Sequence, residues 1–220
     1  MKFSYLFIML FFLKVTLVIK GAGTPVPLWS NDDSLIGLTQ EEGEKKLKKF
    51  VEQGLYKADR LGATLLHWAA RLNKPDYVQL LIQKGIGSMV RDQKGNTPLH
   101  WAAAHNSPEA LFWLMKMGAR PELMNNEKKT ALHLSASAPC TRLLLIAGAQ
   151  VVARDSKGRT PLHYAPDIET AELLINRGAD PTAEDEKSHM TARMALENGR
   201  YELFLHLAPL LCPLGPVNKN

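Results

Sequence analysis

The sequence predicts an all-α solenoid in which helix-turn-helix units are joined by tight turns or short hairpin loops. The first observation is an internal Thr-x-Leu-His motif, which begins at Thr64, Thr97, Thr130 and Thr160 and has a faded copy at Thr191. These threonines are separated by 33, 33, 30 and 31 residues. The second is a glycine after each leucine-rich segment, at Gly85, Gly118, Gly148 and Gly178. The third is an Asp-x-x-Gly segment before three of the threonines, at residues 59–62, 92–95 and 155–158. Such a fixed period is typical of stacked units that share one continuous core.

Each unit carries the residues that two short helices and a turn require. The threonine hydroxyl can cap the first helix, and proline in the next position, as in Pro98 and Pro161, suits its first turn. Alanine pairs at 69–70 and 102–103 let neighbouring first helices approach closely, and the leucine runs fill the second layer. The glycine after the leucines ends the second helix in a left-handed conformation. The glycine of Asp-x-x-Gly allows the positive φ of a tight turn.

These motifs resemble the ankyrin repeat, which has a period of about 33 residues and a Thr-Pro-Leu-His start. The resemblance covers about residues 59–211, and a weaker half-repeat extends it to about residue 32. It implies structural roles for four motif pairs, which are Thr64 and His67, Thr97 and His100, Thr130 and His133, and Thr160 and His163. It also implies that the position after each histidine and the turn tips form a concave binding surface.

Departures from the repeat predict local irregularity. The distance from the motif threonine to the helix-ending glycine is 21 residues in two units and 18 in the next two, so we expect an abrupt inter-helix turn near Pro139 and Pro166. Lys128 replaces the turn glycine of the third unit, which predicts irregular stacking around residues 125–140. At the ends we expect caps: a charged helix that starts at the capping box of Thr39 and continues through Glu52, and a last repeat in which Met194 replaces the motif histidine.

The chain divides into residues 1–23, a linker and capping helix over 24–58, the repeat domain over 59–211 and a flexible tail over 212–220. Lys2, an apolar run and the small residues at 21–23 follow the order of a secretory signal peptide, with cleavage before Thr24. Lys14 interrupts the apolar run. A membrane anchor formed by residues 3–19 and a buried structural helix are therefore the alternatives. A signal or an anchor predicts a secreted or periplasmic, extracytoplasmic repeat domain.

The composition excludes several classes of protein. The 220 residues are 45% apolar and 22% charged, which excludes wholesale disorder, and two cysteines cannot form a disulfide-dense scaffold. The net charge of +5 suggests a nucleic-acid partner, but residues 1–23 contain three lysines and no acid. The remaining 24 basic and 22 acidic residues give a net charge of only +2. Because no recognised nucleic-acid-binding motif is present either, we do not expect nucleic acid as a partner.

Few residues are candidates for catalysis. We expect each motif histidine to bond to its own turn or to the next one, and the spacing of His100 and His105 does not match a zinc-binding helix. No metal or cofactor is expected. Cys140 lies near a predicted helix start, where the helix dipole can lower a thiol pKa, but a buried packing role is the alternative. Two repeats separate Cys140 from Cys212, which argues against a disulfide. An enzyme that uses Cys140 or the histidines is the low-weight alternative to a protein without catalysis.

A column of large side chains follows the motif histidines and is the candidate binding surface: Trp68, Trp101, Leu134 and Tyr164. Helical phase points Trp68 away from the core, and exposed tryptophans are frequent hot spots of protein binding. Arg71 and His105 lie about one turn further along the same helices. Basic residues border the column at the turn tips, chiefly Lys94, Lys129, Lys157 and Arg159. They favour an acidic protein partner, while packing against a neighbouring helix and a merely solvated charged face are the alternatives.

The sequence therefore predicts an exported protein-protein interaction module that binds a partner on its concave face without catalysis. The alternative is a membrane-anchored assembly factor or chaperone for an extracytoplasmic enzyme. Membrane contact is expected only if residues 1–23 are not cleaved.

Overall fold

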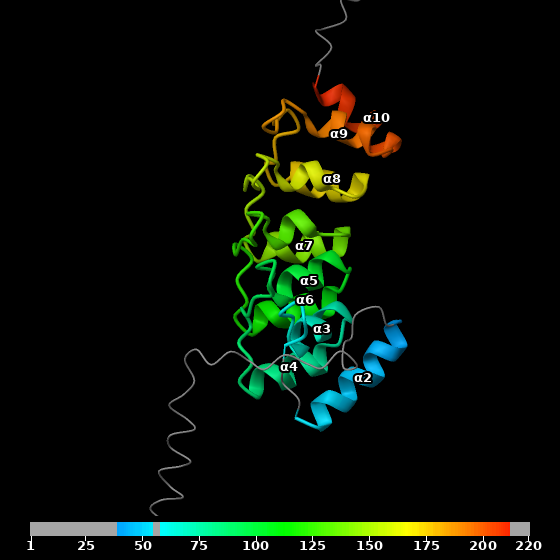
Figure 1. Cartoon of the computed structure of the whole chain (residues 1–220). Helices are drawn as coiled ribbons and strands as arrows, with labels where there is room; N and C mark the ends of the chain where they lie inside the picture. Colours follow the sequence, from blue (N-terminus) through cyan, green and yellow to red (C-terminus); the bar gives the residue numbers. More distant parts are fainter. Residues whose placement is uncertain (1–38, 55–57, 212–220) are drawn as a thin grey trace, which may run out of the picture.

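The computed structural model describes residues 39–54 and 58–211, which form the predicted all-α solenoid (Figure 1). The helix α2 (Gln40–Glu52) lies across one end of the stack. Helix pairs then follow in chain order, with the turns along one side. They are α3 (Leu65–Arg71) with α4 (Pro75–Gln83), α5 (Pro98–Ala104) with α6 (Pro108–Lys116), the 3₁₀ helix η2 (Ala131–Leu134) with α7 (Ala138–Ile146), the 3₁₀ helix η3 (Pro161–Tyr164) with α8 (Ile168–Ile175), and α9 (Thr191–Glu197) with α10 (Tyr201–Leu211). We call the first helix of each pair inner and the second outer.

The core runs without interruption between neighbouring pairs. The inner helices contribute fully buried alanines, at positions 69, 70, 102 and 103, whose small side chains allow α3 and α5 to pack closely. The outer helices each contribute a buried leucine, at positions 81, 114, 144 and 174. Leu47 and Phe50 of α2 cover one end of this core, and Leu203 and Leu207 of α10 cover the other. No single pair has a core of its own, so neighbouring repeats stabilise one another.

The predicted capping box starts α2. The backbone N–H of Glu42 donates to the Thr39 hydroxyl oxygen at 3.3 Å, and the backbone N–H of Thr39 donates to the Glu42 carboxylate at 3.0 Å. These two bonds satisfy donors that the start of a helix leaves free. The N-terminus of α2, where the described chain begins, is therefore capped by side chains.

The turns form a continuous hydrogen-bonded ladder, so the irregularity expected around residues 125–140 does not occur in the turn that contains Lys128. Lys128 takes the left-handed conformation of the glycine that it replaces, with φ of 57°. Each turn donates one backbone N–H to a carbonyl of the preceding turn at 2.8–3.0 Å, in the pairs Gln93 to Leu61, Asn126 to Lys94, Ser156 to Glu127 and Glu186 to Lys157. The third turn therefore stacks like the others, at the local cost of a lysine with positive φ.

The two shorter repeats lack residues in the inner helix. The sequence instead predicted that the missing residues shorten the turn between the helices. The inner helices α3 and α5 have seven residues each, whereas η2 and η3 are 3₁₀ helices of four residues. In the longer units, left-handed Asn73 and Asn106 reverse the chain after a full helix. In the shorter units the chain becomes extended directly after the 3₁₀ turn, at Ser135 and Ala165.

The last repeat has a different alignment from the one that the sequence suggested. Met190, not Thr191, stands at the cap of α9, and Thr191 is its first helical residue. The Thr191 hydroxyl is buried and has no hydrogen-bond partner. Counting from the turn aspartate, Arg193 and not Met194 then occupies the histidine position, because Asp185 precedes Met190 by the five residues that separate Asp155 from Thr160. Thr191 resembles the motif threonine but lies one residue after the position that the motif threonine occupies in the other repeats.

Several predictions concern residues outside this description. The signal or anchor segment over 1–23 and the tail over 212–220 lie there, as does most of the linker over 24–58. Within residues 39–54 and 58–211, no helix is long and apolar enough to cross a membrane.

Candidate binding surface

The aromatic side chains that follow the motif histidines are each bonded to the aspartate of their own turn. In each case an aromatic N–H or O–H donates to the Oδ2 atom of an aspartate nine residues earlier. The pairs are Trp68 with Asp59 at 3.0 Å, Trp101 with Asp92 at 3.0 Å, and Tyr164 with Asp155 at 2.5 Å. One turn geometry therefore fixes the direction of three rings in different repeats.

The same aspartates also hold the turns closed. Oδ1 of Asp92 accepts from the backbone N–H groups of Lys94 at 2.9 Å and Asn96 at 2.8 Å. Its Oδ2 accepts from Trp101 and from the Asn96 side chain at 3.2 Å. Because Asp92 is only 9% exposed, these donors replace the water that a free carboxylate would bind.

The third repeat lacks both members of the pair. Leu134 replaces the aromatic residue and has no polar hydrogen, and Asn125 replaces the aspartate. The Asn125 Oδ1 still accepts from the backbone N–H groups of Glu127 and Lys129, both at 2.9 Å. Its Nδ2 donates to Asn96 in the preceding turn at 2.8 Å. Asn125 thus lacks the second carboxylate oxygen that accepts from the aromatic residue in the other three repeats. Leu134, at the aromatic position of the same repeat, has no donor that would need it.

The motif histidines link one repeat to the next. The Nδ1 atom of His100 accepts from the backbone N–H of Thr97 at 3.2 Å, and its Nε2 faces the carbonyl of Lys129 in the following turn at 3.0 Å. This geometry assigns the neutral Nε2–H tautomer. His67, His133 and His163 make the equivalent contacts. All four rings are buried, and burial lowers their pKa values, that of His100 to about 4. They are placed to hold the stack together, along with their motif threonines.

Trp68 is buried, so the expectation that its ring points into solvent is wrong. Its side chain is 2% exposed. The ring makes a T-shaped contact with the Trp101 ring at a centroid distance of 5.1 Å, and the Arg71 guanidinium lies over it at 5.1 Å. Helical phase alone missed these neighbours because one of them belongs to the next repeat. Trp101, Leu134 and Tyr164 are only partly buried.

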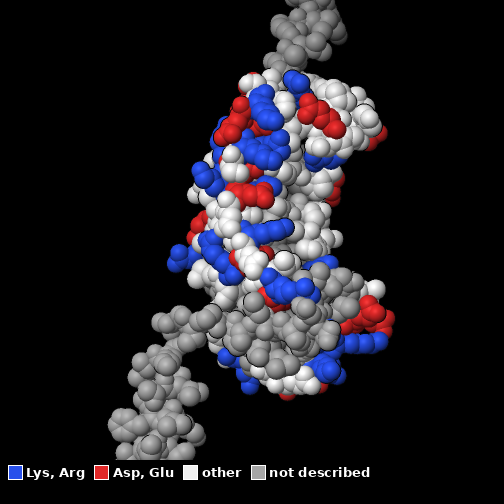
Figure 2. Space-filling model, in the orientation of Figure 1, with Lys and Arg blue, Asp and Glu red and all other residues white. Residues whose placement is uncertain are grey.

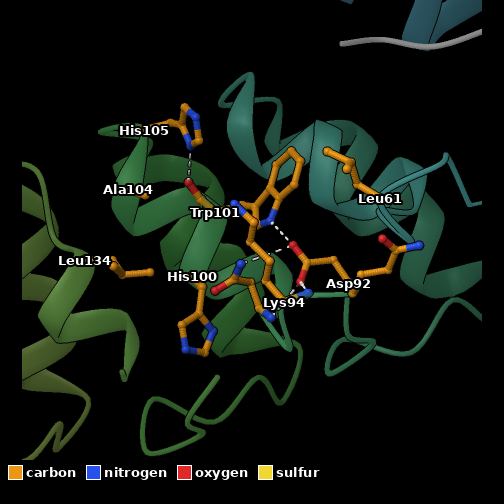
Figure 3. A pocket seen from close by; sticks show the side chains of 10 residues that line it. Leu61, Asp92, Lys94, His100, Trp101, Ala104, His105 and Leu134 are labelled. Atoms are coloured by element: carbon orange, nitrogen blue, oxygen red, sulfur yellow. Dashed lines mark hydrogen bonds between the residues drawn. The ribbon is translucent and has the colours of Figure 1, made fainter. Parts of the chain in front are cut away.

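A hollow of about 240 Å³ opens beside Trp101, and we call it the Trp101 hollow (Figure 3). Its apolar wall consists of Leu61, Trp101, Ala104 and Leu134. Figure 3 shows Leu61 and Leu134 on opposite sides of Trp101. The polar side chains around it include Asp92, Lys94, His100 and His105. His105 is placed by a contact between its Nδ1 and the Trp101 carbonyl at 2.9 Å, and burial lowers its pKa. The hollow thus combines a fixed aromatic ring, aliphatic side chains and one exposed cation, Lys94.

The predicted basic ridge is broken. Lys94 and Lys157 are exposed and form no ion pair within the part of the chain that the structure describes. Lys129 pairs with Glu127 at 2.8 Å and lies 4.8 Å from the Tyr164 ring centroid. Arg159 pairs with buried Asp185 at 3.0 Å. Figure 2 shows acidic side chains between basic ones along the turn side. Two of the four predicted tip cations therefore stabilise the turns.

The environment of Cys140 does not favour a nucleophile. Cys140 is fully buried, and burial raises the pKa of its thiol, the opposite of what an activated nucleophile needs. Cys212 lies outside the described residues. Within the described ranges, no group of His, Cys, Asp and Glu side chains is arranged to hold a metal ion.

Sequence reasoning missed two sets of residues at this surface. The first is the aspartates at 59, 92 and 155, for which the Asp-x-x-Gly pattern predicts only a turn. Their constant spacing of nine residues from an aromatic donor is a signal that the sequence does contain. The second is Leu61 and Ala104, whose position in the wall of the Trp101 hollow depends on how neighbouring repeats stack.

Comparison with known protein families agrees with this architecture. A family model described as ankyrin repeats (three copies) matches residues 38–125 and 103–185. Together these matches span most of the described chain. A search of curated proteins finds no match.

Proposed function

The chain belongs to the ankyrin-repeat family, and on that premise we propose that it is an exported, non-catalytic module that binds a partner protein through the Trp101 hollow. Repeats of this family indicate a protein-protein interaction module. The location of the binding surface, the absence of catalysis and the export are the further parts of the proposal.

The orientation of Trp101 is the observation that carries the proposal. Its ring is held by the 3.0 Å bond to Asp92 and by the edge-on contact with Trp68, yet it remains partly exposed in the wall of the hollow. A large ring that is already fixed loses little conformational entropy on binding. Tryptophan in such a position is the residue type that most often dominates a protein interface.

The chemistry of the hollow indicates the kind of partner. Its aliphatic and aromatic wall suits an apolar side chain, and Lys94 at the rim suits a carboxylate. The single carboxylate in the wall, Asp92, is occupied by internal hydrogen bonds and repels an acidic ligand less than a free one does. A segment with an apolar anchor and a neighbouring acidic residue is the partner that fits best.

Export rests on the sequence of residues 1–23, with its basic start, apolar run and small residues before Thr24. On this proposal the repeat domain acts as a secreted or periplasmic protein. Retention of residues 3–19 as an anchor leaves the same domain attached to a membrane.

The binding proposal can be tested with a library of displayed random peptides. Peptides selected on the wild-type protein are synthesised, and their Kd values are measured by fluorescence anisotropy against the wild type and two variants. We expect Trp101→Ala to weaken binding at least about 30-fold, the equivalent of a 2 kcal/mol hot spot.

Phe112→Ala is the matched control, because Phe112 is an exposed aromatic residue on the outer helix α6, away from the hollow. It should change the Kd less than about threefold, within the range of neutral surface contacts. Circular dichroism must show that both variants are folded. Selected peptides that bind Trp101→Ala as tightly as the wild type would contradict the proposal.

A further inference from the structure

A second hollow adjoins the Trp101 hollow at His105, which lines both. This second hollow of about 220 Å³, which we call the Arg71 hollow, lies where α2 meets the first repeat, and its wall includes Thr39, Trp68 and Arg71. The rings of Trp68 and Trp101, one from each wall, are 5.1 Å apart. We refer to the two hollows together as the groove.

The groove begins at the point where the described chain begins. Thr39, the first described residue, contributes to the wall of the Arg71 hollow. The segment that precedes it, residues 24–38, is therefore tethered at the end of the groove. An extended chain spans about 3.3–3.6 Å per residue, so a segment of this length reaches some 50 Å. This length is enough for the segment to reach both hollows, because they share His105.

The charge of this segment is opposite to that of the groove. Residues 24–38 contain two carboxylates, Asp32 and Asp33, and no basic residue. The groove contains the cations Arg71 and Lys94. Its carboxylate, Asp92, is buried and bonded to four internal donors. Apolar residues lie on both sides of the acidic pair in the sequence, including Trp29 before it and Leu35 after it.

The apolar groups also match in kind. The groove offers the ring of Trp101 together with Leu61 and Leu134, and Arg71 already lies over the Trp68 indole at 5.1 Å. An aromatic residue and an acidic pair within one short segment are what a wall of this composition recognises. The chain itself supplies such a segment immediately before the groove.

We propose that residues 28–38 dock in the groove of the same molecule, with the carboxylates of Asp32 and Asp33 near Arg71 and Lys94 and the Trp29 side chain in the Trp101 hollow. The tether gives the segment a high effective concentration, so an external ligand must displace it. This inference takes the binding surface from the proposed function and adds an intramolecular competitor for it. It also specifies the ligand chemistry of that surface: an apolar anchor followed within a few residues by two acids.

The test uses protein recovered from expression of all 220 residues. The probe is a fluorescein-labelled synthetic peptide with the sequence of residues 24–38, and its binding is followed by anisotropy. The variant Trp29→Ala/Asp32→Asn/Asp33→Asn weakens the binding of the tethered segment to the groove. We expect the peptide to bind this variant at least about tenfold more tightly than it binds the wild type, where the intact segment competes.

Two further variants locate the effect. Ser30→Ala/Asn31→Ala alters the same segment without changing its charge or its apolar residues, and it should behave like the wild type. Addition of Trp101→Ala to the triple variant should abolish the gain, with folding checked by circular dichroism. Equal binding to the wild type and the triple variant, or no binding to either, overturns the proposal.

The result is separable from the test of the proposed function. Library peptides that require Trp101 but bind the triple variant no more tightly than the wild type leave the binding module intact and refute the docked segment. If the 24–38 peptide binds the triple variant and no library peptide requires Trp101, the segment docks as proposed and the external partner site is refuted.

Discussion

The indole N–H of Trp101 donates to the Oδ2 atom of Asp92, nine residues earlier, at a distance of 3.0 Å. The bond joins an inner helix to the turn that precedes it, and the ring that it orients forms a wall of the Trp101 hollow. Equivalent bonds occur in the first and fourth repeats. Turn stability and the shape of the binding surface therefore depend on the same carboxylate.

Replacement of Asp92 by asparagine should destabilise the protein. The remaining oxygen can still accept from the backbone N–H groups of Lys94 and Asn96, but the new amide N–H₂ faces the Trp101 donor. A buried donor without an acceptor costs about 1–3 kcal/mol. Urea denaturation of Asp92→Asn should show a loss of that size in the free energy of unfolding.

The third repeat provides the matched control for this variant. The double variant Asp92→Asn/Trp101→Leu reproduces the natural pair of Asn125 and Leu134. It removes the opposing indole donor and leaves the Asn96 side-chain donor in place. Its loss of stability should be smaller than the sum of the two single losses by more than the roughly 0.5 kcal/mol of ordinary non-additivity. Strictly additive losses would show that the ring and the turn are not coupled.

Mild acid should destabilise the fold through the four motif histidines. Burial lowers their pKa values in the folded protein, that of His100 to about 4, whereas an unfolded histidine has a pKa of about 6.5. Between these values the unfolded state binds more protons, so stability is complete above the unfolded pKa and falls as the pH decreases. His100 alone accounts for roughly 2 kcal/mol between pH 7.5 and pH 5.

Urea denaturation at these two pH values measures this effect. His100→Gln keeps an acceptor and a donor at the site without a titrating group, so its stability should depend less on pH than that of the wild type. An unfolding free energy that is the same at pH 7.5 and pH 5 in the wild type would refute the buried neutral histidines.

Cys140 should be unreactive in the folded protein. Its thiol is fully buried in α7, and burial raises its pKa, so little thiolate is available at neutral pH. In a Cys212→Ser background, iodoacetamide at pH 7.5 should leave Cys140 unmodified until urea is added. Rapid alkylation of the folded protein, detected by mass spectrometry, would instead reopen a nucleophilic role for this residue.

The exported form should begin at Thr24 or an immediate neighbour. The small residues at 21–23 provide the cleavage zone of the proposed signal peptide. Mass spectrometry of the protein recovered from the extracytoplasmic fraction determines its first residue. An intact Met1 in a membrane fraction would contradict cleavage and establish the anchor.

The repeat architecture was predictable because its signals are local and recur. The motif histidines and the glycines that end the outer helices specify capping and chain reversal within a few residues, and these features hold in every unit where they occur. The capping helix was predictable for the same reason, since Thr39 and Glu42 satisfy each other's backbone donors.

The errors arise where the outcome depends on a neighbouring repeat. Helical phase predicts that Trp68 faces outward, but the Trp101 ring and the Arg71 guanidinium cover its indole. Lys129 and Arg159 occupy turn tips, yet carboxylates in the same or the next turn engage them. In the last repeat, Thr191 resembles the motif threonine, and only the turn that starts at Asp185 sets the alignment. None of these contacts is specified by helical phase.

The most direct test of binding at the Trp101 hollow is a titration followed by the NMR signals of the tryptophan indole N–H groups. A library-selected peptide is added to ¹⁵N-labelled protein, and each indole signal is assigned with a Trp→Phe variant. We predict that the Trp101 signal shifts in proportion to the bound fraction, while that of Trp113 on the outer helix α6 does not move. A shift of the Trp113 signal with an unchanged Trp101 signal would place the binding surface elsewhere and contradict the proposed function.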